Sequence, residues 1–107
     1  MNVIPDTDPK MTSLVRRVLM QFNVGKVDEQ LFTPDARAVL SISEIQKRLN
    51  AFSLPAAIIN SSELVGISRE NNERVYRYLL TDFGSSLLCT VKLTQDGRIS
   101  AIEVRSV

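Results

Sequence analysis

The chain has 107 residues, of which 44% are hydrophobic and 23% charged, and its 13 basic and 12 acidic residues leave a net charge of +1. This length predicts a single domain over residues 1–107, with a flexible end at 1–8. The lack of histidine excludes Ser-His-Asp and Cys-His catalysis, and the single cysteine excludes an internal disulfide and a cysteine-rich metal site. We therefore expect neither a catalytic metal nor a cofactor.

The first predicted element is a helix over residues 9–23. Asp8 is a suitable N-cap, and Pro9 favours the first helical position. Apolar side chains then recur at helical spacing and form one stripe, at Met11, Leu14, Val15, Val18, Leu19 and Phe22. Gly25 stands where a C-terminal cap is expected, so this helix should end before the glycine and pack its stripe on a core.

Two further helices are predicted before residue 55. The tripeptide at 33–35, Thr-Pro-Asp, is typical of a helix start and opens a short helix. Its buried side is expected to hold Ala36, Val39 and Leu40. Ser41 and Glu44 have the spacing of a capping box and open the third helix, which Pro55 ends. The apolar face of this third helix is expected to hold Ile45, Leu49 and Phe52.

After residue 55 the pattern changes to β-branched and aromatic residues that alternate with polar ones, which predicts strands. The predicted strands are 57–69, 73–81, 86–94 and 98–105. They are separated by turn signals at Asn71-Asn72, at residues 82–85 and at Asp96-Gly97. The fold class is therefore predicted to be α+β, with three N-terminal helices packed on a four-stranded antiparallel sheet.

Strand alternation also assigns side chains to faces. In the predicted strand 86–94 one face holds Leu87, Cys89, Val91 and Leu93. Cys89 should therefore point at the core and behave as a small hydrophobic residue, with no reactive role. Glu103 alternates with apolar neighbours and is expected to face outward.

The most informative stretch for a binding site is 74–80. Alternation places Arg74, Tyr76, Tyr78 and Leu80 on one face, and Val75, Arg77 and Leu79 on the other. Two tyrosines on one face of a central strand can line a pocket, so Tyr76 and Tyr78 are candidate ligand contacts. Arg77 is a candidate for binding an anion or for pairing with Glu63 or Glu103. Ordinary sheet packing is the competing interpretation for all three candidates.

Three helices followed by a curved antiparallel meander is the element order of the nuclear-transport-factor-like superfamily, also called SnoaL-like or cystatin-like. Residues 32–41, Ile45, 48–49 and 52–55 resemble an accessory domain that is often fused to serine hydrolases, and so does the later run from 76–78 through 93–99. The resemblance covers about residues 10–105. It implies a cone-shaped sheet around the first helix, often with a pocket inside the cone, and an accessory rather than catalytic role.

The chain departs from the catalytic members of that superfamily. Ketosteroid-isomerase-like enzymes use a tyrosine with carboxylates in the cone, whereas most acidic residues here fall at predicted turns and helix starts. We therefore expect a non-catalytic module that forms a homodimer through its sheet and binds a small apolar or anionic ligand in the cone. Two alternatives stay open. One is an isomerase or lyase, with Tyr76 or Tyr78 as hydrogen-bond donor and Asp82 as base; the other is an interaction subunit for a separate hydrolase or regulator.

The charge distribution and the hydropathy of the sequence limit the kinds of partner that we expect. The basic residues Arg16, Arg17, Lys47 and Arg48 are expected on solvated helix faces, so we expect no nucleic-acid partner. No apolar run approaches the ~18 residues of a membrane span, and the first residues lack the basic region of a signal peptide. Together with a lone cysteine, this predicts a cytoplasmic protein that does not contact a membrane.

Overall fold

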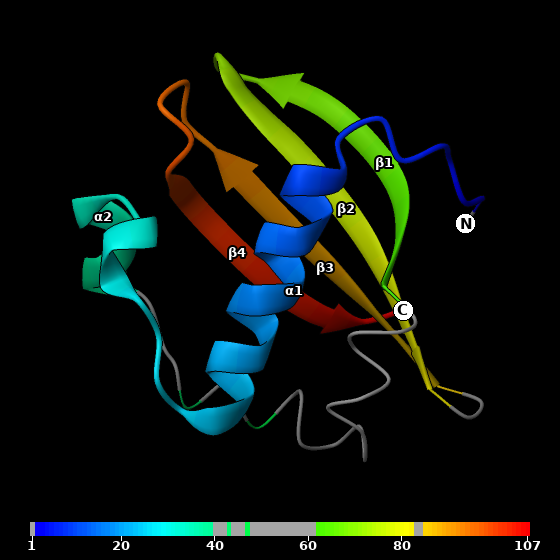
Figure 1. Ribbon diagram of the computed structural model, residues 1–107, viewed down its shortest axis with the longest axis horizontal. Coiled ribbons are helices and arrows are strands. Elements are labelled where there is room, and N and C mark those ends of the chain that lie inside the picture. Colours follow the sequence, from blue (N-terminus) through cyan, green and yellow to red (C-terminus); the bar gives the residue numbers. More distant parts are fainter. Residues whose placement is uncertain (1, 40–42, 44–46, 48–61, 83–84) are drawn as a thin grey trace.

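The computed structural model describes residues 2–39, 43, 47, 62–82 and 85–107. Within these residues, helix α1 (Pro9–Val24), the 3-10 helix η1 (Glu29–Leu31) and helix α2 (Pro34–Val39) precede a four-stranded sheet (Figure 1). The strands are β1 (Ser62–Glu70), β2 (Glu73–Asp82), β3 (Ser85–Leu93) and β4 (Ile99–Ser106). The α+β class is thus confirmed. Of the predicted third helix, Ser43 and Lys47 alone are described. Its other residues lie outside the described part of the chain, as do Leu40 of the second predicted helix and residues 57–61 of the first predicted strand.

The sheet is an antiparallel meander in the order β1-β2-β3-β4, as predicted. Asn71 and Asn72 join β1 to β2 with φ angles of 51° and 67°, the pair of positive values that a tight type I′ hairpin needs. Gly97, with φ of 85°, lies in the loop between β3 and β4. These turns fix the register, which pairs Tyr76 with Val91 and Tyr78 with Cys89.

Helix α1 begins and ends where its capping residues predict. Asp8 accepts a hydrogen bond from the backbone N–H of Met11 through its side chain, and Pro9 occupies the first helical position. At the other end Gly25 adopts the left-handed conformation, with φ of 78°. Its N–H donates to the Phe22 carbonyl, and the next N–H, of Lys26, donates to the Gln21 carbonyl. Both ends of α1 are therefore set by local sequence.

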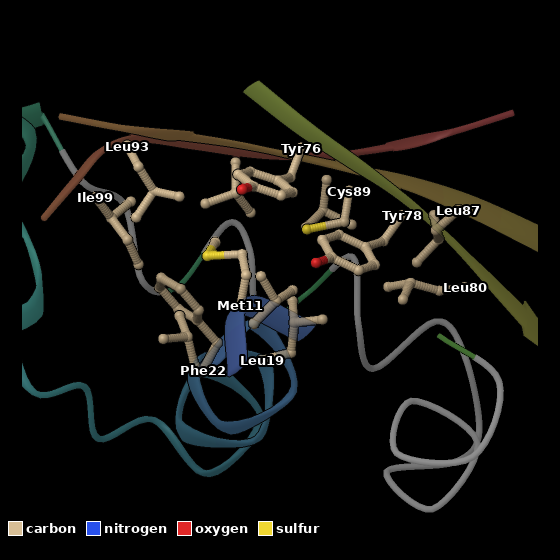
Figure 2. Packing of buried hydrophobic residues seen from close by; sticks show 14 of the residues in the cluster. Met11, Leu19, Phe22, Tyr76, Tyr78, Leu80, Leu87, Cys89, Leu93 and Ile99 are labelled. Carbon is tan, nitrogen blue, oxygen red and sulfur yellow. The ribbon is translucent and has the colours of Figure 1, made fainter. Parts of the chain in front are cut away.

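The core lies between α1 and one face of the sheet (Figure 2). Helix α1 contributes its predicted stripe, and β2 and β3 contribute alternate side chains that include Tyr78 and Cys89. The fully buried side chains with the largest volumes are Tyr78, Phe22 and Phe32. Phe22 meets Phe32 edge to face, with ring centroids 6.2 Å apart, which joins α1 to the segment before α2. Cys89 is a core residue, as predicted.

Helix α2 differs from its prediction at one side chain. Ala36 is buried, but Val39 is 83% exposed, so the expectation of a buried Val39 was wrong. The helix is anchored at its start, where the Thr33 N–H donates to the Ile99 carbonyl and the Thr33 hydroxyl accepts from the Ala36 N–H. Ala36, the buried residue of α2, lies three residues after the Thr33 anchor, and Val39 lies three residues farther along the helix.

The first residues lie against the sheet. The N–H of Ile4 donates to the Leu64 carbonyl of β1 at 2.9 Å, and the Ile4 side chain packs on the core. Within residues 2–8, Ile4, Asp6 and Asp8 make contacts with the rest of the fold. The flexibility expected of residues 1–8 stays a prediction. No helix in the described part of the chain is both long and apolar enough to cross a membrane.

Candidate functional site

Tyr76 points from β2 toward the start of α1. Its hydroxyl donates to Oδ2 of Asp8 at 3.0 Å, while Oδ1 of the same carboxylate caps the helix. Arg74, two residues earlier on the same face of β2, has its Nη1 3.5 Å from the Tyr76 hydroxyl and 4.0 Å from the Asp8 carboxylate. One aspartate therefore serves as both helix cap and anchor to the sheet.

Tyr78 makes the second connection to the N-terminal segment. Its hydroxyl lies 3.1 Å from Oγ1 of Thr12, and Thr12 donates its only hydroxyl proton to Oδ2 of Asp6 at 2.6 Å. The proton between the two hydroxyls must then come from Tyr78, which gives a directed chain from tyrosine to threonine to carboxylate. We call Asp6, Asp8, Thr12, Tyr76 and Tyr78 the tyrosine clasp.

Burial raises the pKa of both tyrosines. Burial raises the pKa of Tyr78 from its ordinary value of 10.0 to about 12, and the nearby Asp6 charge acts in the same direction. Burial also raises the pKa of Tyr76, as does its hydrogen bond to Asp8. Neither hydroxyl is therefore ionised near neutral pH, and each directs its proton to a protein oxygen.

This arrangement does not present a free proton donor to a ligand. A ligand that engaged the tyrosine hydroxyls would have to displace Asp8 or Thr12, or else contact the ring faces. Asp82, the base proposed with these tyrosines, lies four residues beyond Tyr78 along β2, about 13 Å away along an extended strand. Among the side chains that the structure describes, no group of three or more acidic, cysteine or histidine residues is placed to hold a metal ion.

Arg77 lies on the opposite face of the sheet, as alternation predicts. Its Nη1 donates to the Ser68 hydroxyl at 3.0 Å, and its Nη2 lies 3.8 Å from the Glu70 carboxylate. The pairing expected with Glu63 or Glu103 is replaced by these two neighbours on β1. Glu103 instead lies 4.0 Å from Arg105 on its own strand. Both ion pairs are well exposed to solvent and add little to stability.

The register brings one row of side chains together across this second face. Arg77 pairs with Thr90, and Thr90 pairs with Glu103, so a cation and a carboxylate flank the central threonine. The next row pairs Leu79 with Leu88 and Leu88 with Arg105. We call this surface the outer face; it is formed by Val75, Arg77, Leu79, Leu88, Thr90, Lys92, Ala101, Glu103 and Arg105.

Apolar side chains occupy the middle of the outer face. Val75 and Leu88 are 0% and 4% exposed although neither belongs to the core cluster on the α1 side. Lys92 lies opposite Val75 in the register, and Arg105 lies opposite Leu88. The face therefore combines buried apolar side chains in its middle with charged side chains around them.

Two features of these sites were missed by sequence reasoning. The carboxylates of Asp6 and Asp8 were not assigned to the tyrosines, because 68 positions separate Asp8 from Tyr76. The available signal was that a core-facing tyrosine hydroxyl requires a partner. Arg16 was expected on a solvated helix face, but it is half-buried, and its Nη2 donates to the Ser62 carbonyl at 3.2 Å.

Comparisons of the chain with protein-family models, with curated proteins and with solved structures gave no match. The superfamily resemblance therefore stays a prediction.

Proposed function

We propose that this chain is a non-catalytic module that forms a homodimer through the outer face of its sheet and binds a small apolar or anionic ligand on the α1 side. The observation that supports the dimer is the row of neighbouring side chains Arg77, Thr90 and Glu103 on the outer face. Neighbouring strands lie about 4.8 Å apart, so the cation and the carboxylate are placed about equally on either side of β3.

This row is complementary to itself. In a face-to-face dimer with a twofold axis along β3, β2 of one subunit faces β4 of the other. Arg77 then lies opposite Glu103 of the partner subunit, twice per dimer, while Leu88 and Thr90 meet their own copies near the axis. Opposite charges around an apolar centre favour this orientation over alternatives that place Arg77 on Arg77.

The clasp supports a non-catalytic role. A tyrosine that acts as an electrophilic donor needs its proton free for the substrate, and here both protons are directed to protein oxygens. A general base must lie within hydrogen-bond reach of its substrate, and the proposed Asp82 lies far along β2 from the tyrosines. The hydroxyls of Tyr76 and Tyr78 then serve mainly to stabilise the fold. Any contact of these residues with a ligand would come from their rings.

The finer architecture belongs to the same proposal. We propose that a third helix, between Ser41 and Pro55, completes a cone-shaped, cystatin-like domain with the nuclear-transport-factor-like order of elements. The hairpin meander packed on α1 supports this assignment. The buried lone thiol of Cys89 suits a reducing compartment, and we propose a cytoplasmic location.

The dimer is tested by light scattering after size exclusion, over a range of protein concentrations. We expect the mass of two chains for the natural sequence and of one chain for Leu79→Glu, which places a carboxylate in the apolar centre. Val39→Glu is the matched control, because it makes the same kind of change at an exposed position of α2. A single-chain mass for the natural protein at every concentration, or equal dissociation of both variants, would contradict the proposal.

A further inference from the structure

Arg16 is a half-buried cation in the middle of α1. Its Nη2 donates to the carbonyl of Ser62, the first residue of β1, so the side chain reaches from the helix to the sheet. Its Nε is buried and has no hydrogen-bond acceptor among the described residues. The adjacent Arg17 is exposed, so the two arginines lie in different environments.

Among the described residues, Arg16 has fewer acceptors than its guanidinium has donors. A guanidinium can donate five hydrogen bonds, and a buried donor without an acceptor is costly, especially on a charged group. The ion pairs of the described residues join Arg74 to Asp8, Arg77 to Glu70, Arg98 to Asp96 and Arg105 to Glu103. Within this part of the chain, Arg16 thus has a neutral carbonyl as its acceptor and no carboxylate.

We propose that Arg16 binds the carboxylate of a small apolar monocarboxylic acid between α1 and the start of β1. The edge of a guanidinium formed by Nε and Nη matches a carboxylate in size and geometry, and binding would supply the acceptor that Nε lacks. This inference rests on the proposed ligand-binding function and names its ligand class; it does not depend on the proposed dimer.

The charge and the apolar character of the ligand follow from the neighbours. Thr12 lies one helical turn before Arg16 and holds the Asp6 carboxylate, so a second negative charge on the ligand would be repelled. Buried apolar side chains lie beside the start of β1, where Leu64 pairs with Tyr78 and Leu80 lies opposite the first residue of the strand. A monoanion with a hydrocarbon body is therefore favoured over a phosphate dianion or a sugar acid.

The test uses NMR of the full chain labelled with 15N at arginine Nε. The probes are benzoate, octanoate, phenyl phosphate and the neutral benzamide, each at about 10 mM, which detects dissociation constants of about 1 mM or tighter. We expect benzoate or octanoate to shift the Arg16 Nε–H resonance and to raise the melting temperature, and phenyl phosphate to bind at least about tenfold more weakly.

Three substitutions make the test specific. Arg16→Gln should weaken carboxylate binding at least about tenfold, and Arg16→Lys should lose most of it, because an ammonium lacks the planar fork. Arg17→Gln removes the same charge from the exposed neighbour and should leave binding unchanged. If Arg16→Gln does not fold, the Arg16→Lys variant and the Nε resonance of the natural protein still decide the result.

The inference would be overturned by the absence of a shift of the Arg16 resonance with either carboxylate. Equal weakening of binding by Arg16→Gln and Arg17→Gln would overturn it as well, and so would equal affinity for phenyl phosphate. Binding of benzamide that is as strong as that of benzoate and insensitive to Arg16→Gln would also reject the role of Arg16. That last result would leave the wider proposal of an apolar ligand intact. Failure of the inference about Arg16 can therefore be distinguished from failure of the proposed ligand-binding function.

Discussion

The Tyr76 hydroxyl lies 3.0 Å from the Asp8 carboxylate and donates to it, which joins the centre of the sheet to the N-cap of α1. The same carboxylate accepts from the Met11 N–H with its other oxygen. Helix start and sheet are therefore held by one side chain. The geometry fixes the first turn of α1 over β2, and it engages a tyrosine that the sequence suggested as a ligand contact.

Removal of the Tyr76 hydroxyl should destabilise the fold. Tyr76→Phe keeps the buried ring and loses the bond to Asp8, so we expect the free energy of unfolding to fall by about 1–2 kcal/mol in urea denaturation. Asp8→Asn still caps the helix. In that background Tyr76→Phe should have a smaller effect. Equal effects in both backgrounds would mean that the two side chains are not coupled.

The high pKa of Tyr78 predicts a loss of stability in alkali. In the unfolded chain Tyr78 ionises near its ordinary pKa of 10.0, while burial raises its pKa in the folded protein to about 12. Between these values the unfolded state binds fewer protons, so stability that is complete below pH 10 decreases as the pH rises toward 12. Tyr78→Phe should flatten this decrease when urea denaturation is repeated across that range. An unchanged pH dependence would show that Tyr78 titrates normally.

The Cys89 thiol should be inert in the folded protein. It is fully buried, and burial raises its pKa from 9.0 to about 12. A disulfide reagent at neutral pH should therefore react only when the chain unfolds, and the reaction rate should rise with urea as the unfolded population rises. Fast, urea-independent labelling of the native protein would place the thiol at the surface.

The β1–β2 turn should depend on residues that tolerate positive φ. Asn72 has φ of 67°, a conformation that costs an alanine about 1 kcal/mol. We expect Asn72→Ala to lower the free energy of unfolding by about that amount and Asn72→Gly to preserve or raise it. Circular dichroism during thermal unfolding checks both variants. Equal melting temperatures for Asn72→Ala and Asn72→Gly would argue against the turn geometry.

Local signals were sufficient for most of the fold. Asp8, Pro9 and Gly25 set the limits of α1, which ends one residue later than predicted. The Asn71-Asn72 turn and the alternation in β2 and β3 set the register, because a slip by one residue would bring Arg77 into the core. These features depend on residues close in sequence, and sequence patterns report such relationships well.

Features that depend on distant contacts were not predicted. Val39 has the apolar character and spacing of a core residue, but whether a short helix buries it depends on where α2 lies against the sheet. The partners of Tyr76 and the carbonyl that holds Arg16 belong to segments far away in sequence. Arg77 was placed on the correct face, yet its partner among several acidic residues was decided by the geometry of β1 and β2.

The most direct test of the central claim mixes two charge-reversal variants, Arg77→Glu and Glu103→Arg, in sedimentation velocity. Each variant alone places like charges opposite each other in the proposed dimer, whereas one chain of each restores opposite charges at both contacts. We predict that each variant alone sediments as a monomer, and that an equimolar mixture sediments as a dimer like the natural protein. Variants that dimerise alone as well as the natural protein, or a mixture that stays monomeric, would contradict the proposed interface.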